Sequence, residues 1–116
     1  MTERFGSDLR LRRRSEFKAV EAGGRRVSGR FVVLVARPNG QPTHRLGLVA
    51  SRRVGGAVVR NRAKRRLREL FRRRVMAADL VGLDIVAIAK ADIVRAPFDA
   101  VATDFLAALS KLRGAR

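Results

Sequence analysis

The sequence contains no cysteine, no tryptophan and no tyrosine, so six phenylalanines supply all of its aromatic rings. Without cysteine it can form neither disulfides nor thiolate metal sites. Its apolar runs are too short to span a bilayer, and its first 17 residues contain no apolar run of the kind that a secretory signal needs. We therefore expect a cytoplasmic protein.

Acidic residues are also scarce, because 10 Asp and Glu stand against 27 Lys and Arg and leave a formal net charge of +17. Self-repulsion of this size destabilises a compact fold unless a polyanion neutralises it. Nucleic acid is the partner that fits, since contacts to phosphates dominate the affinity of such proteins. Most of the basic residues are arginines, whose planar guanidinium suits phosphates and base edges better than a lysine ammonium does.

The hydrophobic pattern predicts a single small α+β domain in which helices pack on a sheet. The predicted strands are residues 25–28, 31–37, 45–50 and 83–90, with 25–28 as a short edge strand. The predicted helices are residues 11–22, with Ser15 as the N-cap, 57–75 and 98–113. We expect residues 1–9 to form a flexible lead-in, 10–113 the folded domain and 114–116 a tail.

The helix predicted at 57–75 has two opposed faces. One face is an apolar stripe of Val59, Ala63, Leu67 and Leu70, with Phe71 at its edge. The opposite face carries Asn61, Arg65, Arg68 and Arg72. Residues 51–74 contain 11 basic residues and a single acid, Glu69, which we expect to hold Arg65 and Arg73. Such a helix docks on its own core and presents cations to a polyanion. The plainer alternative is a solvated basic face.

The string from Ser51 to Glu69 resembles the signature of the bacterial ribonuclease P protein family. That signature has a Ser-basic-basic-Val-Gly entry, then Ala-Val-x-Arg-Asn-Arg, then a helix rich in Lys and Arg. The matching residues are Ser51, Arg52, Arg53, Val54, Gly55, Ala57, Val58, Arg60, Asn61, Arg62, Lys64, Arg65, Arg66, Leu67, Arg68 and Glu69. An early family pattern is matched by Arg10, Leu11, Arg12, Glu16, Phe17 and Val20. Glu21 stands where many members have a second aromatic residue.

The resemblance implies both a fold and a function. The implied fold is a four-stranded sheet with three helices, whose basic helix lies in a left-handed βαβ crossover (ribosomal S5 domain 2-like). The implied function is that of the protein subunit of ribonuclease P, which binds the catalytic RNA subunit and the 5′ leader of precursor tRNA and assists endonucleolytic removal of the leader. In this family the RNA carries the chemistry with bound Mg²⁺. No catalytic residue and no metal ligand is therefore expected in the protein.

The resemblance also implies two sets of site residues. Those expected to bind the RNA subunit are Arg60, Asn61, Arg62, Lys64, Arg65, Arg66 and Arg68. Those expected to bind the leader are Phe17, Phe31, Val33, Ser51, Arg52, Arg53 and Lys90. Arginine can grip a phosphate with two parallel hydrogen bonds, and single-stranded bases stack on aromatic rings. Structural alternatives stay open, since Asn61 can instead cap a helix, and the two phenylalanines and Val33 can be ordinary core residues.

No other pattern in the sequence indicates an active site. His44 is the only histidine and has no cysteine to share a metal with. The aspartates are scattered, with no pair at a spacing typical of a two-carboxylate metal site. We expect Asp84 to be a strand residue that either faces solvent or lies near a turn. Two rival functions fit the charge. One is a structural RNA-binding protein, such as a ribosomal protein or an RNA chaperone, and the other is a cationic protein at a membrane surface.

Overall fold

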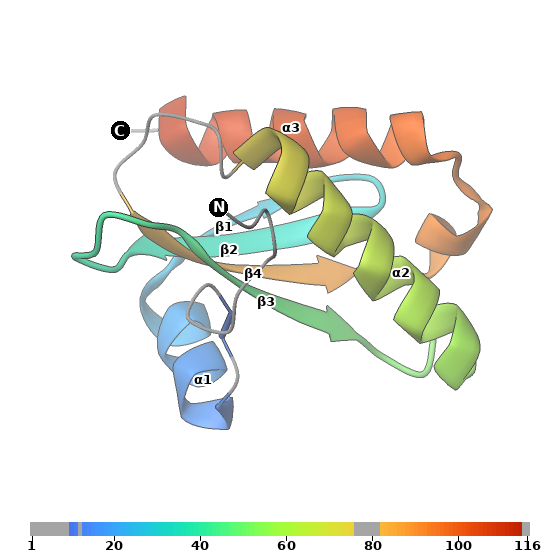
Figure 1. The fold of residues 1–116 in the computed structure, drawn as a ribbon, viewed down its shortest axis with the longest axis horizontal. Coiled ribbons are helices and arrows are strands. Elements are labelled where there is room, and N and C mark those ends of the chain that lie inside the picture. Colours follow the sequence, from blue (N-terminus) through green and yellow to red (C-terminus); the bar gives the residue numbers. More distant parts are fainter. Residues whose placement is uncertain (1–9, 12, 76–81, 115–116) are drawn as a thin grey trace, which may run out of the picture.

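The computed structural model describes residues 10–11, 13–75 and 82–114. Within them the elements are, in chain order, α1 (Arg14–Gly23), β1 (Arg25–Ser28), β2 (Val32–Pro38), β3 (Arg45–Ala50), α2 (Ala57–Leu70), η2 (Phe71–Val75), β4 (Leu83–Ala89), η3 (Ala91–Arg95) and α3 (Phe98–Gly114). Here η2 is a π-helical turn and η3 a 3-10 helix. All four predicted strands and all three predicted helices are found, and Figure 1 shows them coloured along the chain.

The strands form one mixed sheet in the order β1-β2-β4-β3. The β1–β2 and β2–β4 pairs are antiparallel, whereas β3 and β4 are parallel and are joined by a crossover through α2. In Figure 1, β3 and β4 run to the right, α2 crosses in front of the sheet, and β4 lies above β3. This path makes the crossover left-handed. It is the handedness that the family resemblance implied and the reverse of the usual rule.

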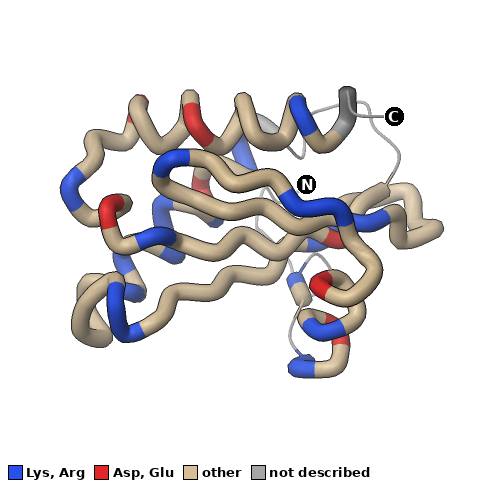
Figure 2. Tube along the Cα trace, turned by 180° about the vertical axis from the view of Figure 1, so that it is seen from behind, with Lys and Arg blue, Asp and Glu red and all other residues tan. Residues whose placement is uncertain are grey.

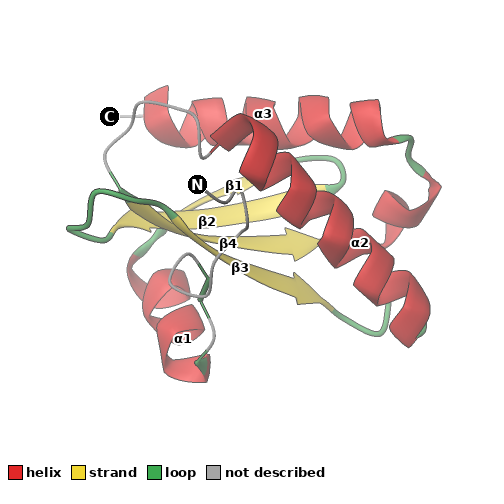
Figure 3. Ribbon diagram, in the orientation of Figure 1, coloured by secondary structure: helices red, strands yellow, loops and turns green. Residues whose placement is uncertain are grey.

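Alternation along the strands divides the apolar side chains between the two faces of the sheet. One face packs against α2 and α3, and the core there includes Leu34, Leu46, Leu67, Ile85 and Phe105, each at most 2% exposed. The other face packs against α1 in a smaller core formed by Leu11, Val20, Val33, Val35 and Val86, with Phe17, Val49 and Ile88 partly buried beside it. Figure 3 shows the three α-helices placed around this sheet.

Helix α1 begins later than the apolar pattern predicts. Its first residue is Arg14, its N-cap is Arg13, and the prediction of Ser15 as N-cap is wrong. The backbone N–H of Arg13 donates to Glu16 Oε1 at 3.0 Å. The carboxylate in the third helical position therefore takes up a backbone donor at the helix start, a task that the prediction gave to a serine hydroxyl.

The residues before α1 extend the sheet and are not helical. Leu11 is 5% exposed, and its backbone N–H donates to the carbonyl of Leu46 at 3.0 Å. A parallel bridge between Arg10 and Leu46 completes this contact along the β3 edge. Leu11 was predicted as the first residue of the helix. The conformation of Leu11 is instead set by its pairing with the edge strand β3. The sequence around Leu11 gives no sign of this pairing.

Helix α2 follows its predicted pattern with one exception. It is α-helical to Leu70 and continues as the π-helical turn η2. Ala63, Leu67, Leu70 and Phe71 are buried, as the apolar stripe predicted. Val59, the first residue of the stripe, is 37% exposed. The first turn of α2 is therefore less covered by the core than the rest of the helix.

Asp84 is buried, so the prediction that it faces solvent is wrong, whereas the alternative of a strand residue near a turn agrees with its place as the second residue of β4. It is 3% exposed and accepts hydrogen bonds from Arg45 Nε and Nη2 at 2.8 and 2.7 Å and from Asn39 Nδ2 at 2.9 Å. Burial raises the pKa of this carboxyl, but the hydrogen bonds from Arg45 and Asn39 outweigh burial and hold the pKa below its usual range. Beside it, His44 Nδ1 accepts the backbone N–H of Leu83 at 3.0 Å.

Candidate nucleic-acid interface

The chain turns sharply between β3 and α2. The backbone N–H of Val54 donates to the carbonyl of Ser51 at 3.0 Å, and that of Gly55 to the carbonyl of Arg52 at 3.1 Å. Gly55 has a φ of +149°, a conformation that favours glycine. The turn leaves Ser51, Arg52 and Arg53 exposed at the entry to α2. These three residues of the predicted leader set are thus together on one surface loop.

The seven residues predicted to bind the RNA subunit lie on consecutive turns of α2. Asn61, Arg62 and Arg65 are exposed, and Arg60, Lys64, Arg66 and Arg68 are partly buried. The N-cap of α2 is Gly56, so Asn61 does not cap the helix. Among the described residues, no carboxylate forms an ion pair with any of the seven. The fold therefore leaves these cationic donors without an internal counter-charge.

Glu69, the single acid of this segment, forms ion pairs with one predicted and one unpredicted arginine. Glu69 binds Arg72 Nη2 at 2.7 Å and Arg73 Nε at 2.6 Å. The predicted partner Arg73 is confirmed, whereas Arg65 is replaced by Arg72. Positions three and four residues away both neighbour Glu69 on a helix, and the two arginines of η2 occupy its carboxylate. Arg65 is therefore left facing outward without that partner.

A hollow of about 300 Å³ lies between one flank of α2 and the segment that precedes α1. Its walls are Arg10, Leu11, Phe17, Leu46, Leu48, Lys64 and Arg68. Three cationic side chains thus converge beside an aromatic ring. Like charges held together repel one another, and an anion between them would relieve that repulsion. The hollow is therefore suited to a phosphate with a base beside it.

Arg68 is partly buried in this hollow. Its Nε is buried and has no hydrogen-bond partner among the described residues. Burial lowers the pKa of Arg68, and the charges of Arg10 and Arg65 lower it further. An arginine remains protonated despite such a shift, so its environment favours an added negative group over loss of the proton.

Two of the predicted leader residues meet on the α1 face of the sheet. Phe17 is partly buried and packs beside Val33, which is 7% exposed, in the smaller core. At the far end of the strands, Lys90 Nζ donates to Ser28 Oγ at 2.8 Å and to the carbonyl of Gly29. Val33 is thus a core residue, Phe17 is a core residue with an accessible side, and the ammonium of Lys90 is tied to β1.

Phe31 does not join Phe17. It precedes the first residue of β2, and its backbone N–H donates to Asp104 Oδ2 of α3 at 2.8 Å. Its ring packs against the larger core, with the guanidinium of Arg30 at 5.3 Å from the ring centroid. Residue 31 lies outside β2, so the alternation along that strand does not place its side chain beside Phe17.

The sequence-based site set did not include four residues that line the hollow between α2 and the segment before α1, which are Arg10, Leu11, Leu46 and Leu48. Arg10 had been placed only within the early family pattern, and the hollow shows it facing Lys64 and Arg68 across the β3 edge. The signal that could have found it is its position before Leu11, the residue that pairs with β3. Basic residues also occur away from α2, and Figure 2 shows them along β1 and near the ends of strands.

The part of the chain that the structure describes carries neither a metal site nor a membrane span. No group of three or more His, Asp or Glu side chains there is arranged to hold a metal ion. None of the helices there combines the length and the apolar character needed to cross a membrane. Glu21, which stands where the resemblance leads us to expect an aromatic residue, is exposed on α1.

The family model described as ribonuclease P matches residues 5–113. The chain belongs to the ribonuclease P family. The ribonuclease P protein component of Caldanaerobacter subterraneus subsp. tengcongensis is 40% identical over 90 residues, which are 77% of this chain and 76% of that protein. The one of Citrifermentans bemidjiense is 36% identical over 109 residues, 94% of this chain and 92% of that protein.

Solved structures of ribonuclease P proteins share the fold. The one from Thermotoga maritima is 34% identical with a TM-score of 0.81, covering 90% of this chain and 98% of that one. One from Staphylococcus aureus is 26% identical with a TM-score of 0.78, covering 88% and 93%. The family assignment from Ser51–Glu69 is thus confirmed, and with it the predicted fold and the role as a ribonuclease P protein subunit.

Proposed function

We propose that α2 binds the catalytic RNA subunit of ribonuclease P and that the α1 face of the sheet binds the 5′ leader of precursor tRNA. The observation that supports this most is the run of seven basic or amide side chains on α2, with which no carboxylate of the described residues pairs. In a chain with a formal net charge of +17, a polyanion on this helix relieves self-repulsion.

The hollow between α1 and α2 supports a path for single-stranded RNA. The partly buried ring of Phe17 offers a surface on which a base can stack, and Arg10, Lys64 and Arg68 can hold the adjoining phosphates. Stacking tolerates any base, which suits leaders of varied sequence. Capture of the leader would favour the precursor over the mature tRNA, and the cations would screen repulsion between the two RNAs.

The chemistry of leader removal belongs, in this proposal, to the RNA with Mg²⁺. The described carboxylates do not fit a protein magnesium site, because no three of them lie together and several have other partners. Asp84 accepts from Arg45, Glu69 binds Arg72 and Arg73, and Asp104 accepts backbone N–H groups. The protein would therefore act by binding and positioning RNA in the cytoplasm, and no hydrolytic step is assigned to its side chains.

The two rival functions would require other properties of the protein. A membrane-surface helix needs a free apolar face, but Ala63, Leu67 and Leu70 of α2 are buried in the protein's own core. A general RNA-binding protein would share the charge and would need no preference for a leader. The family favours the ribonuclease P role, and a comparison of precursor with mature tRNA separates it from general RNA binding.

The test is reconstituted cleavage. Purified protein is mixed with the ribonuclease P RNA transcribed from the same genome and with a precursor tRNA at low Mg²⁺, and the rate is compared with that of the RNA alone. We expect the protein to raise the rate and to bind precursor more tightly than mature tRNA. No gain in rate together with equal affinity for both tRNAs would refute the proposal, as would cleavage by the protein without RNA.

A further inference from the structure

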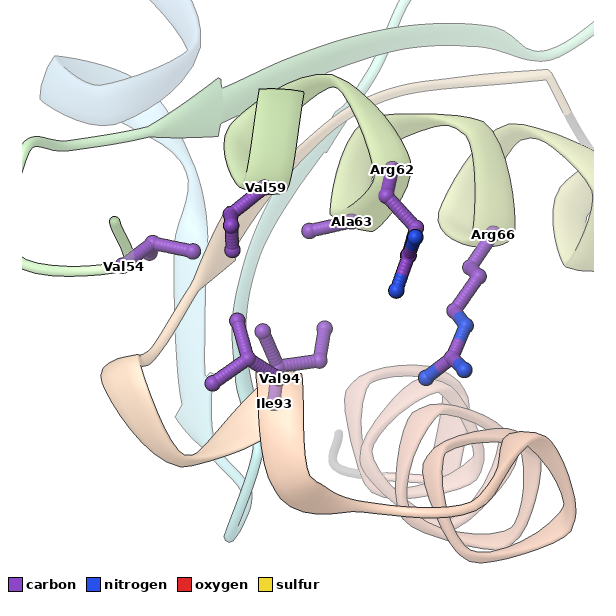
Figure 4. A pocket seen from close by; sticks show the side chains of 7 residues that line it. All are labelled: Val54, Val59, Arg62, Ala63, Arg66, Ile93 and Val94. Carbon is purple, nitrogen blue, oxygen red and sulfur yellow. The ribbon is translucent and has the colours of Figure 1, made fainter. Parts of the chain in front are cut away.

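A second hollow lies on the opposite flank of α2, where the helix faces η3. Its volume is about 260 Å³, and its walls are Val54, Val59, Arg62, Ala63, Arg66, Ile93 and Val94. Figure 4 shows Arg62 and Arg66 reaching down from α2 while the two residues of η3 point up toward Val59. The hollow thus has apolar walls on both sides and two guanidinium groups along one edge.

This hollow exposes apolar side chains within the most basic part of the chain. Val59 is 37% and Val94 is 42% exposed, and both lie in the hollow. Removal of such surface from water is favourable in proportion to the area covered. An occupant that covers both valines while meeting Arg62 would therefore gain apolar contact and charge complementarity at the same place.

The walls are held in place by the fold itself. Arg66 Nη1 donates to the carbonyl of Ala96 at 2.9 Å, which ties α2 to the end of η3. On the other side, the side chain of Val59 lies so close to Gly55 that a Cβ on residue 55 would stand 2.9 Å from it. Arg62 has no carboxylate partner among the described residues. The hollow is therefore preformed, with one cation free to meet a ligand.

We propose that this hollow takes one unstacked nucleobase of the RNA that α2 binds, with Arg62 on the neighbouring phosphate or against the face of the base. The inference rests on the proposed function. RNA is recognised largely through bases splayed out of the helix, which pack on apolar and aromatic surfaces or on guanidinium planes. The volume of about 260 Å³ lies below the range typical of pockets for drug-sized ligands, which suits one base better than a run of nucleotides.

Charge favours RNA over the other possible occupants. A second copy of the chain would bring another formal net charge of +17 to a rim that already carries Arg62 and Arg66. A segment of another protein with acidic and apolar side chains could pair with the two arginines of the rim, but it would compete with RNA for the same helix. These two occupants are outcomes that the experiment separates from a nucleobase.

The experiment uses neutral substitutions in the hollow and matched ones outside it. Val59→Gln and Val94→Gln make the walls polar, and Val58→Gln and Ala91→Gln place the same side chain at exposed positions of α2 and η3 that do not line the hollow. Affinity for the ribonuclease P RNA is measured for each variant, and each complex is treated with reagents that modify unstacked bases. Thermal unfolding of each variant shows that the fold is retained.

We expect the two hollow variants to bind the RNA about tenfold more weakly than their controls, in line with the loss of one base contact. One base that wild-type protein protects should become reactive in both, while the other protections remain. Equal affinities for variants and controls, with no change at a base, would overturn the inference and leave the proposed function standing. So would a change confined to self-association or to binding of an acidic protein. Failure of the wild-type protein to bind the RNA would refute both this inference and the proposed function.

Discussion

The ring of Phe17 lies against the backbone of Gly47. A Cβ on residue 47 would stand 2.7 Å from Cε2 and Cζ of Phe17, closer than real Cβ atoms come to another group, and 3.1 Å from Cβ of Leu11, which is a tight contact. Glycine inside a strand ordinarily weakens it, and its use marks a place where another group approaches closely. The ring of Phe17 fits against β3 only because residue 47 is a glycine without a side chain. This contact also helps to fix the position of α1.

Gly47→Ala tests this contact. We expect the ring to be displaced, with a loss of about 1–3 kcal/mol in the free energy of unfolding, as for other overpacked sites, and a smaller preference for precursor over mature tRNA. Urea unfolding and the ratio of the two tRNA affinities measure both effects. Gly23→Ala in α1 is the control, because its Cβ would come no closer than 3.7 Å to another side chain. Unchanged stability and tRNA preference in Gly47→Ala would show that the ring is not seated in this way.

Phe17 itself can act as a core residue, as a stacking surface, or as both, and two variants separate these roles. Phe17→Ala removes the ring and its packing, whereas Phe17→Leu keeps much of the apolar volume without the ring. If a leader base stacks on the ring, both should lose leader affinity by about 1–3 kcal/mol, and only the alanine variant should lose much stability. Retained leader affinity in Phe17→Leu would leave Phe17 a core residue only.

The parts of the structure that local sequence dictates were predicted. The apolar stripe of α2 is buried at Ala63, Leu67 and Leu70 because a 3.6-residue period fixes which side chains face the sheet. The strand at 45–50 was predicted with its correct bounds. The family string from Ser51 to Glu69 then identified the helix that carries the basic residues, which periodicity alone could not connect to a function.

What the sequence could not show depends on contacts between distant residues. Asp84 is buried because its register partner Arg45 lies on the neighbouring strand and binds it. Leu11 pairs with β3, and Phe31 turns away from Phe17 because it lies before β2 begins. In each case a residue has a plausible local role, but it contacts a partner 35 or more residues away, namely Arg45 for Asp84, Leu46 for Leu11 and Asp104 for Phe31.

Binding of RNA through α2 predicts a specific dependence on salt. Arg60→Ala, Arg62→Ala and Arg65→Ala should each weaken affinity for the RNA subunit and lower the slope of log K against log salt by about one, since each removes one phosphate contact. Lys111→Ala, which removes the same charge from an exposed position of α3, is the control and should leave the slope unchanged. If all three α2 variants keep the wild-type slope, these residues do not contact phosphates.

The buried pair of Arg45 and Asp84 predicts how stability responds to acid. The pKa of Asp84 is held below its ordinary value of 3.8, so the carboxylate contributes stability above that value, and the contribution is lost as pH falls through the lowered pKa. Asp84→Asn should cost about 1–3 kcal/mol at pH 7, because Arg45 then loses the carboxylate charge and one of the two oxygens that accept its hydrogen bonds. Its stability should fall less steeply than that of the wild type on acidification.

Urea unfolding at pH 7, 5, 4 and 3 measures this difference. Glu21→Gln, at an exposed position of α1, removes the same charge and should leave the acid response close to that of the wild type. An Asp84→Asn curve parallel to the wild-type curve over this pH range would mean that the native pair does not set the acid response.

The convergence of Arg10, Lys64 and Arg68 predicts that anions stabilise the free protein. An anion that binds only the folded state adds RT ln(1 + [L]/Kd), or about 2.7 kcal/mol at a hundred times Kd. Sulfate should therefore raise the unfolding free energy more than chloride does at equal ionic strength. Arg68→Met keeps the apolar stem but removes one cation from the hollow, so its gain from sulfate should be smaller. Arg26→Met, at an exposed position of β1, should gain as much as the wild type. Equal gains in the two variants would mean that sulfate acts on the net charge of the chain and not at this hollow.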